Sequence, residues 1–132
     1  MAAKQMMTTG ANRAEATRML QTELRALRRL KHRHVIALYF VVLDDPTYVA
    51  MVMQLSTLGT LSGLLQGKRA ELKTVPGQRR MLHSVASGMA FLHSSKVQHH
   101  DLKPDNVLAF DDGDGKLYGK LSDFGLAVTQ QW

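Results

Sequence analysis

The sequence predicts an α+β fold from three features of its residue pattern. Residues 12–31 and 76–95 carry apolar side chains at the three- and four-residue spacing of amphipathic helices. Residues 35–43 and 48–55, which lie between them, are rich in β-branched and aromatic residues, as strands are. A loop-rich end with several Asp residues follows, and there is no internal repeat. Helix, two strands, helix and loops are the element order of an α+β domain.

The first predicted helix covers residues 12–31. Asn12 is a suitable N-cap, and Glu15 three residues later completes a pattern like a capping box. Residues 8–10, Thr-Thr-Gly, are expected to form the loop before the helix. Its buried face is predicted from apolar residues at i, i+4 and i+7, namely Leu20, Leu24 and Leu27.

The two central apolar runs are expected to pair as an antiparallel hairpin. Residues 35–43 read as a buried strand, and residues 48–55 read as its partner. Asp-Asp-Pro at 44–46 supplies the turn, because Asp initiates turns and Pro fixes φ. A short helix is expected at 60–66.

The second long helix is predicted from Pro76 to Ser95, since proline is tolerated in a first helical turn. Beyond it, Asp-Asp-Gly-Asp-Gly at 111–115 is a turn between short strands at 107–108 and 117–121. The buried face of the helix is expected to carry Leu82, Val85, Met89 and Leu92.

Composition limits the class of protein. The chain has 132 residues, a formal net charge of +6 and no cysteine, which excludes a disulfide scaffold and a thiolate metal site. Its longest apolar run, nine residues from Val35 to Leu43, is too short to span a bilayer. A single domain in the cytoplasm, without a membrane span, is therefore expected.

Basic residues are concentrated near the end of the first helix. The cluster contains Arg25, Arg28, Arg29, Lys31 and Arg33, with His32 and His34 among them. It is either a nucleic-acid patch or the solvated face of an amphipathic helix. We favour the solvated face and expect no nucleic-acid partner, because no nucleic-acid-binding motif accompanies the charge.

Two segments carry the residues of a chemical site. Asp101, Lys103 and Asn106 lie on one predicted loop, and Asp-Phe-Gly follows at 123–125. Carboxylate and amide oxygens suit Mg²⁺, which prefers a few such ligands together with phosphate oxygens. A carboxylate that does not bind metal could accept a proton from an alcohol, and a lysine could neutralise a phosphate. These are the requirements of phosphoryl transfer.

The two segments resemble the motifs of eukaryotic protein kinases of the serine/threonine type. The family's catalytic loop, H-R-D-L-x-x-x-N, stands here as HHDLKPDN, and its metal loop D-F-G stands as SDFGLA. The resemblance covers almost the whole chain. Further matching segments are Met1–Lys4, Leu30–Tyr39, Tyr48–Leu55, Leu58–Leu61 and Ala86–His93.

The resemblance implies ATP and Mg²⁺ as cofactors, a protein substrate and a role for each matching residue. Asp101 would be the catalytic base, and Lys103 would contact the γ-phosphate, as is usual for the serine/threonine type. Asn106 and Asp123 would hold Mg²⁺. The remaining roles concern ATP and the hydrophobic stack.

Lys4 would contact the α- and β-phosphates and would be held in place by Glu23. The adenine ring would be enclosed by Ala2 and Leu108, and its polar edge would meet the backbone groups of Gln54 and Ser56. Met53 would be the gatekeeper. The hydrophobic stack would consist of His99, Phe124, Leu27 and Leu38.

The sequence also departs from the family pattern. No Gly-rich loop precedes Lys4, and no activation loop or A-P-E element follows Gly125. We therefore expect a truncated bilobal kinase fold, with part of the N-terminal lobe at 1–55 and the hinge and start of the C-terminal lobe at 56–132. Apolar faces left uncovered would make the chain associate. His100 replaces the Arg that pairs with an activation-loop phosphate, so regulation by phosphorylation is in question.

The expected function is protein serine/threonine kinase activity, present as a fragment inactive by itself. The alternative is a non-catalytic kinase remnant that acts as a binding or regulatory module. A small-molecule phosphotransferase fits less well, because Leu-Lys-Pro at 102–104 and the D-F-G-L-A run have the protein-kinase form.

Overall fold

The computed structural model describes residues 2–7, 13–42 and 48–129, and only the backbone of residues 2–7, 13, 48 and 49. The loop predicted at 8–10, the N-cap Asn12 and the turn at 44–46 lie outside the described residues. The elements are β1 (Ala2–Met7), α1 (Arg13–Leu27), β2 (Leu38–Val42), β3 (Tyr48–Met53), α2 (Leu61–Gln66), η2 (Ala70–Lys73), α3 (Val75–Ser94), β4 (Val97–Gln98), η3 (Pro104–Asn106), β5 (Val107–Asp111), β6 (Leu117–Leu121) and β7 (Val128–Thr129).

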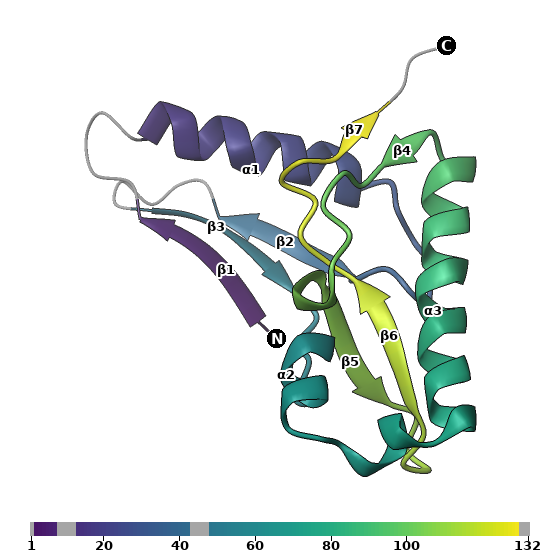
Figure 1. Ribbon diagram of the computed structural model, residues 1–132. Coiled ribbons are helices and arrows are strands. Elements are labelled where there is room, and N and C mark those ends of the chain that lie inside the picture. Colours follow the sequence, from purple (N-terminus) through teal and green to yellow (C-terminus); the bar gives the residue numbers. More distant parts are fainter. Residues whose placement is uncertain (1, 8–12, 43–47, 130–132) are drawn as a thin grey trace.

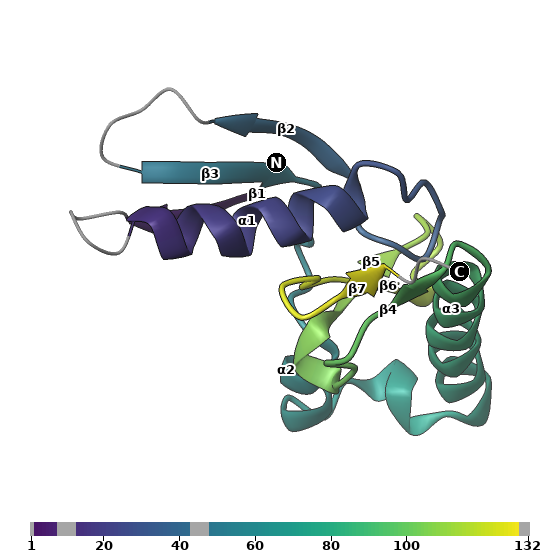
Figure 2. The same ribbon diagram turned by 90° about the horizontal axis from the view of Figure 1, so that it is seen from above.

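The elements form two parts, which confirms the predicted α+β class (Figure 1). In the sheet part, β1, β3 and β2 form an antiparallel sheet in that order, so the predicted hairpin of β2 and β3 is confirmed. Helix α1 runs along this sheet, as Figure 2 shows, and Leu20 packs with the fully buried Met51 of β3. The helical part contains α2, α3 and the short strands, with β5 and β6 forming the expected hairpin.

The segment between α1 and β2 differs from the prediction. Helix α1 ends at Leu27 rather than at residue 31, and β2 begins at Leu38 rather than at residue 35. Residues 34–36 pair instead with β6: Leu121 N–H donates to His34 O and Ile36 N–H donates to Leu121 O, both at 2.9 Å. Because this segment bonds to β6, its backbone does not extend β2, and it joins the sheet part to the helical part.

Helix α3 begins after the N-cap Thr74, whose hydroxyl accepts a hydrogen bond from Gly77 N–H at 3.2 Å. Its fully buried residues are Gly77, Met81, Ser84, Gly88 and Leu92. The prediction for Leu92 is confirmed, Val85 and Met89 are half-buried, and the prediction for Leu82 is wrong because its side chain is 68% exposed.

Small residues explain why the buried face of α3 differs from the predicted one. A Cβ at Gly88 would lie 2.8 Å from His34 O and 2.9 Å from a methyl group of Leu121. A Cβ at Gly119 on β6 would lie 2.9 Å from the sulfur of Met81. Glycine therefore lets α3 and β6 approach closely. A prediction based only on the spacing of large apolar residues does not locate the buried face of α3, because glycine forms part of that face.

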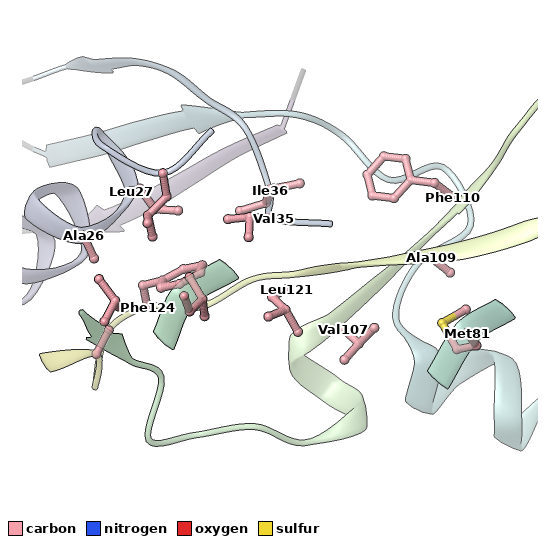
Figure 3. Packing of buried hydrophobic residues seen from close by; sticks show 14 of the residues in the cluster. Ala26, Leu27, Val35, Ile36, Met81, Val107, Ala109, Phe110, Leu121 and Phe124 are labelled. Atoms are coloured by element: carbon pink, nitrogen blue, oxygen red, sulfur yellow. The ribbon is translucent and has the colours of Figure 1, made fainter. Parts of the chain in front are cut away.

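One hydrophobic cluster extends from α1 to α3 and contains Leu27, Val35, Leu121 and Phe124 (Figure 3). Its burial of aliphatic and aromatic surface stabilises the contact between the two parts by the hydrophobic effect. None of the helices in the described ranges has the length and apolar character needed to cross a bilayer.

Candidate active site

Three of the predicted site residues form one hydrogen-bonded group on the loop that ends in η3. The Asn106 side chain is buried, and its Nδ2 donates to Asp101 O at 2.8 Å and to Asp101 Oδ2 at 2.9 Å. Lys103 Nζ lies 3.3 Å from the same Asp101 Oδ2. Pro104 opens η3, whose tight turn returns the chain from Lys103 to Asn106 through a 2.9 Å bond between Asn106 N–H and Lys103 O.

This group keeps the Asp101 carboxyl ionised. The hydrogen bond from Lys103 lowers the pKa of Asp101 most, and the bond from Asn106 adds to it, although desolvation acts in the opposite direction. An ionised carboxylate is purely a hydrogen-bond acceptor. The Asp101 side chain is 30% exposed, so it can accept a hydrogen bond from an incoming hydroxyl group.

The D-F-G segment is tied to this loop through Ser122. Ser122 N–H and Oγ both donate to Asn106 O, at 2.9 and 3.1 Å. The next residue, Asp123, is exposed and has a φ of +59°. His100 is also exposed, with a φ of +63°. Non-glycine residues in this region are strained by about 1–3 kcal/mol and concentrate at functional sites. Ser122 is not among the residues predicted for the site, although its hydroxyl directly before D-F-G was a usable signal.

The donor atoms at Asn106 and Asp123 suit a magnesium ion. Because Nδ2 of Asn106 donates to Asp101, its Oδ1 is left as the ligand atom for a cation. Within the ranges described, no three His, Cys, Asp or Glu side chains gather closely enough to form an all-protein metal site. Magnesium does not need one, since it is commonly held by one or two carboxylates plus phosphate oxygens and water.

His99 contacts both the loop that carries Asp101 and the D-F-G segment. Its ring is buried, its Nε2 lies 2.9 Å from Ser122 O, and its Nδ1 accepts from Asp101 N–H at 3.3 Å. The ring also contacts the fully buried Phe124, with centroids 4.9 Å apart. Leu27 lies in the same hydrophobic cluster, and the half-buried Leu38 packs against it. The four residues predicted to form a stack thus belong to one packed region.

Glu23 connects α1 to the D-F-G segment. Its side chain is buried, and Oε1 accepts a hydrogen bond from Phe124 N–H at 3.4 Å. The predicted partner Lys4 is opposite Met51 in the sheet register, and its side chain lies outside the described residues, so the ion pair stays a prediction. A buried carboxylate requires such partners because its desolvation is costly.

Met53, Gln54 and Ser56, three of the residues predicted to contact adenine, lie where the chain leaves β3, whereas Leu108 is on β5 and Ala2 is on β1. Met53 and Leu108 are half-buried against the main hydrophobic cluster, and the side chain of Ala2 lies outside the described residues. Gln54 N–H donates to Ala37 O at 2.9 Å, so the predicted adenine contact of Gln54 depends on its carbonyl. Ser56 Oγ donates to Ala109 O, which attaches this segment to β5.

Comparisons with known proteins agree with this geometry. The family model described as the protein kinase domain matches residues 1–131. Serine/threonine-protein kinase DCLK1 of Rattus norvegicus is 37% identical over 83% of this chain and 25% of its own length. Receptor-interacting serine/threonine-protein kinase 1 of Homo sapiens is 32% identical over 93% of this chain and 17% of its own length. Protein-tyrosine kinase 6 of Homo sapiens is 37% identical over 83% of this chain and 23% of its own length. The chain thus spans a quarter or less of these relatives.

Proposed function

The chain belongs to the protein kinase family, and on that premise we propose that its site transfers the γ-phosphoryl group of Mg-ATP to a serine or threonine hydroxyl of a protein. The observation that carries this proposal is the bonded group of Asp101, Lys103 and Asn106, attached through Ser122 to Asp123. It joins a hydroxyl acceptor, a cation and an amide oxygen, and Asp123 follows Ser122 directly in the chain, which supports a site for phosphoryl transfer.

Asp101 orients the attacking hydroxyl group by accepting its hydrogen bond. The hydroxyl oxygen bonds to the γ-phosphorus as the bond from that phosphorus to the β–γ bridging oxygen breaks, and ADP leaves. The hydroxyl proton passes to Asp101 and then to solvent. Because the pKa of Asp101 is lowered, this proton transfer is favourable only late, when the oxygen is already bonded to phosphorus.

The neighbouring residues position the phosphates. Lys103, 3.3 Å from Asp101, neutralises γ-phosphate charge next to the attacking oxygen. Asn106 Oδ1 and the Asp123 carboxylate would hold Mg²⁺, and bound Mg-ATP supplies both the phosphoryl group and the cation that neutralises its oxygens. Lys4 would bind the α- and β-phosphates, with Glu23 holding it in place.

The adenine would bind beside the end of β3. The Gln54 carbonyl and the Ser56 backbone would meet its polar edge, while Met53, Ala2 and Leu108 provide apolar contacts. Attachment of Ser56 to Ala109 supports this placement, because it holds the segment after β3 next to β5, the strand that carries Leu108.

Serine/threonine specificity is supported by Lys103 at its position in the loop and by the named serine/threonine relatives, although one relative is a tyrosine kinase. Transfer to peptides that contain only Ser, only Thr or only Tyr would test it. Phosphate on the Tyr peptide alone would contradict this part of the proposal.

The proposal is tested by ATP binding and by transfer. We expect the chain to bind ATP more tightly with Mg²⁺ than with EDTA. Asp123→Asn should abolish that difference, whereas the matched change Asp114→Asn, on the exposed β5–β6 turn, should not. Asp101→Asn should retain ATP binding and lose transfer in the protein that contains this chain. Full transfer by Asp101→Asn would refute the role of Asp101, and absence of ATP binding would leave the non-catalytic module as the better account.

A further inference from the structure

A cavity of about 320 Å³ lies away from the candidate active site, between the first half of α3, the β5–β6 turn and residues 33–34. Four cationic side chains line it: Arg33, Arg79, Arg80 and Lys116. His34, His83 and Tyr118 form other parts of its wall. We call it the cationic pocket.

Two carboxylates act on the four cations of the cationic pocket: Glu71 pairs with Arg80, and the charge of Lys116 is among the causes that lower the pKa of Asp112, after the hydrogen bond with Asp114 N–H. The acid among its lining residues is Asp112, whose carboxylate accepts hydrogen bonds from Asp114 N–H and Lys116 N–H within the turn, at 3.0 and 3.1 Å. In the described part of the chain, no carboxylate forms an ion pair with the side chains of Arg33, Arg79 or Lys116. Like charges gathered in a concave surface raise the local concentration of anions.

The charge of Arg33 contributes to lowered pKa values of two titratable groups near it, His34 and Lys120. Burial lowers the pKa of His34 most, and the charges of Arg33, His32 and His83 lower it further, against a hydrogen bond with Gly119 O that raises it. Burial likewise lowers the pKa of Lys120, with a second contribution from Arg33. The charge of Arg33 therefore acts on both groups, in addition to burial.

Arg80 contributes a buried donor without a partner. Glu71 Oε1 accepts from its Nη2, which holds the guanidinium in place. Its Nε is buried and has no hydrogen-bond partner within the residues described. Buried donors are rarely left unpaired in proteins, so this Nε requires an explanation, and a bound water or ion is one that would satisfy it.

The basic run noted in the sequence is divided among separate concavities. Arg33 lines the cationic pocket, whereas Arg25, Arg28 and Arg29 line a separate cavity between α1 and β7. An extended nucleic-acid backbone needs a continuous stripe of phosphate contacts. A small concavity with a fixed guanidinium instead suits a compact anion that has several acceptor oxygens.

We propose that the cationic pocket binds a phosphate-type oxyanion, held by Arg79, Arg80 and Lys116. The site would be distinct from the ATP phosphates, since none of its lining residues belongs to the loops that carry Asp101 or Asp123. The phosphate could be free or carried by a phosphorylated side chain, and both sources present the same group to the pocket.

The test is calorimetric titration of the full chain with inorganic phosphate, with chloride replacing it at equal ionic strength as the reference. We expect one site with a Kd of about 1 mM or tighter. Arg79→Gln and Lys116→Gln should each weaken it about tenfold, as loss of a charge-assisted hydrogen bond does. The matched controls Lys73→Gln, on η2, and Arg28→Gln, in the other cavity, should leave the Kd unchanged.

A second readout locates the bound anion. The ring proton signals of His83 and Tyr118 should shift during the titration and should shift less in the Arg79→Gln variant. Repeating the titration with O-phosphoserine distinguishes the sources: tighter binding than phosphate indicates a phosphorylated side chain, and weaker binding indicates the free ion. Absence of binding, unchanged affinity in both pocket variants, or an equal loss in Arg28→Gln would overturn the proposal.

Discussion

Replacement of Gly88 by alanine tests whether close approach of α3 and β6 stabilises the fold. The new Cβ would lie 2.8 Å from His34 O and 2.9 Å from a Leu121 methyl group. His34 O has little room to move, because it accepts the 2.9 Å hydrogen bond from Leu121 N–H that attaches residues 34–36 to β6. Leu121 itself is fully buried. The substitution therefore overpacks a constrained contact.

The expected effect is the difference between two opposing contributions. Overpacking of a dense core costs about 1–3 kcal/mol, and the better helix propensity of alanine recovers about 1 kcal/mol. We expect the free energy of unfolding of Gly88→Ala to fall by up to about 2 kcal/mol. For a chain of this size, a fall of that size lowers the melting temperature by up to about 7 °C.

Urea and thermal unfolding followed by circular dichroism measure this effect. Gly63→Ala is the matched control, because Gly63 also lies within a helix, but its added Cβ would meet only Thr60 Oγ1 at an ordinary 3.5 Å. That variant should be as stable as the parent or up to about 1 kcal/mol more stable. If Gly88→Ala matched the gain of Gly63→Ala, the close approach would not be a constraint and the explanation of the α3 face would fail.

Three further predictions concern the site, pH and the surface. Asn106→Ala should lower phosphoryl transfer at least about 10²-fold in steady-state assays, because Asp101 loses two orienting hydrogen bonds; an unchanged kcat would contradict this. The folded-state pKa of His34 is below its ordinary 6.5, so the unfolded chain binds the proton first and stability should decline as pH falls below about 6.5. Urea titrations across that range should show this slope, and His34→Gln should reduce it. Leu82→Lys should reduce self-association in sedimentation experiments with little change in melting temperature, since Leu82 is 68% exposed.

The sequence was sufficient where neighbouring residues determine the structure. The turn after β5 and the short helix after Thr60 depend on local Asp, Gly and capping chemistry. The helix appears as predicted, and the turn is shorter than the predicted 111–115, because β5 extends beyond the predicted 107–108 to Asp111, which pairs with Leu117. The motif residues Asp101, Lys103 and Asn106 lie within one short loop, so their closeness in the sequence was enough to predict that their side chains meet.

The errors arose where a distant segment determines the structure. Residues 35–37 are apolar enough for a strand, but their partner is Leu121, which only the folded chain brings near. The face of α3 depends on Gly77 and Gly88, whose contribution is the absence of a side chain. Glu23 likewise meets Phe124 N–H only after α1 has packed on the helical part.

The sheet part meets the helical part at two segments of the chain, residues 34–37 and 53–56, which we call the crossings, and the bond from Gln54 N–H to Ala37 O fastens the two crossings to each other. The first crossing is also anchored on β6 through Ile36 and Leu121. Because the two crossings are attached to each other, the sheet part can tilt about the line between them more easily than it can slide past the helical part. Any such tilt changes the distance from Glu23 Oε1 to Phe124 N–H, so the hydrogen bond between α1 and the D-F-G segment lengthens or shortens with it.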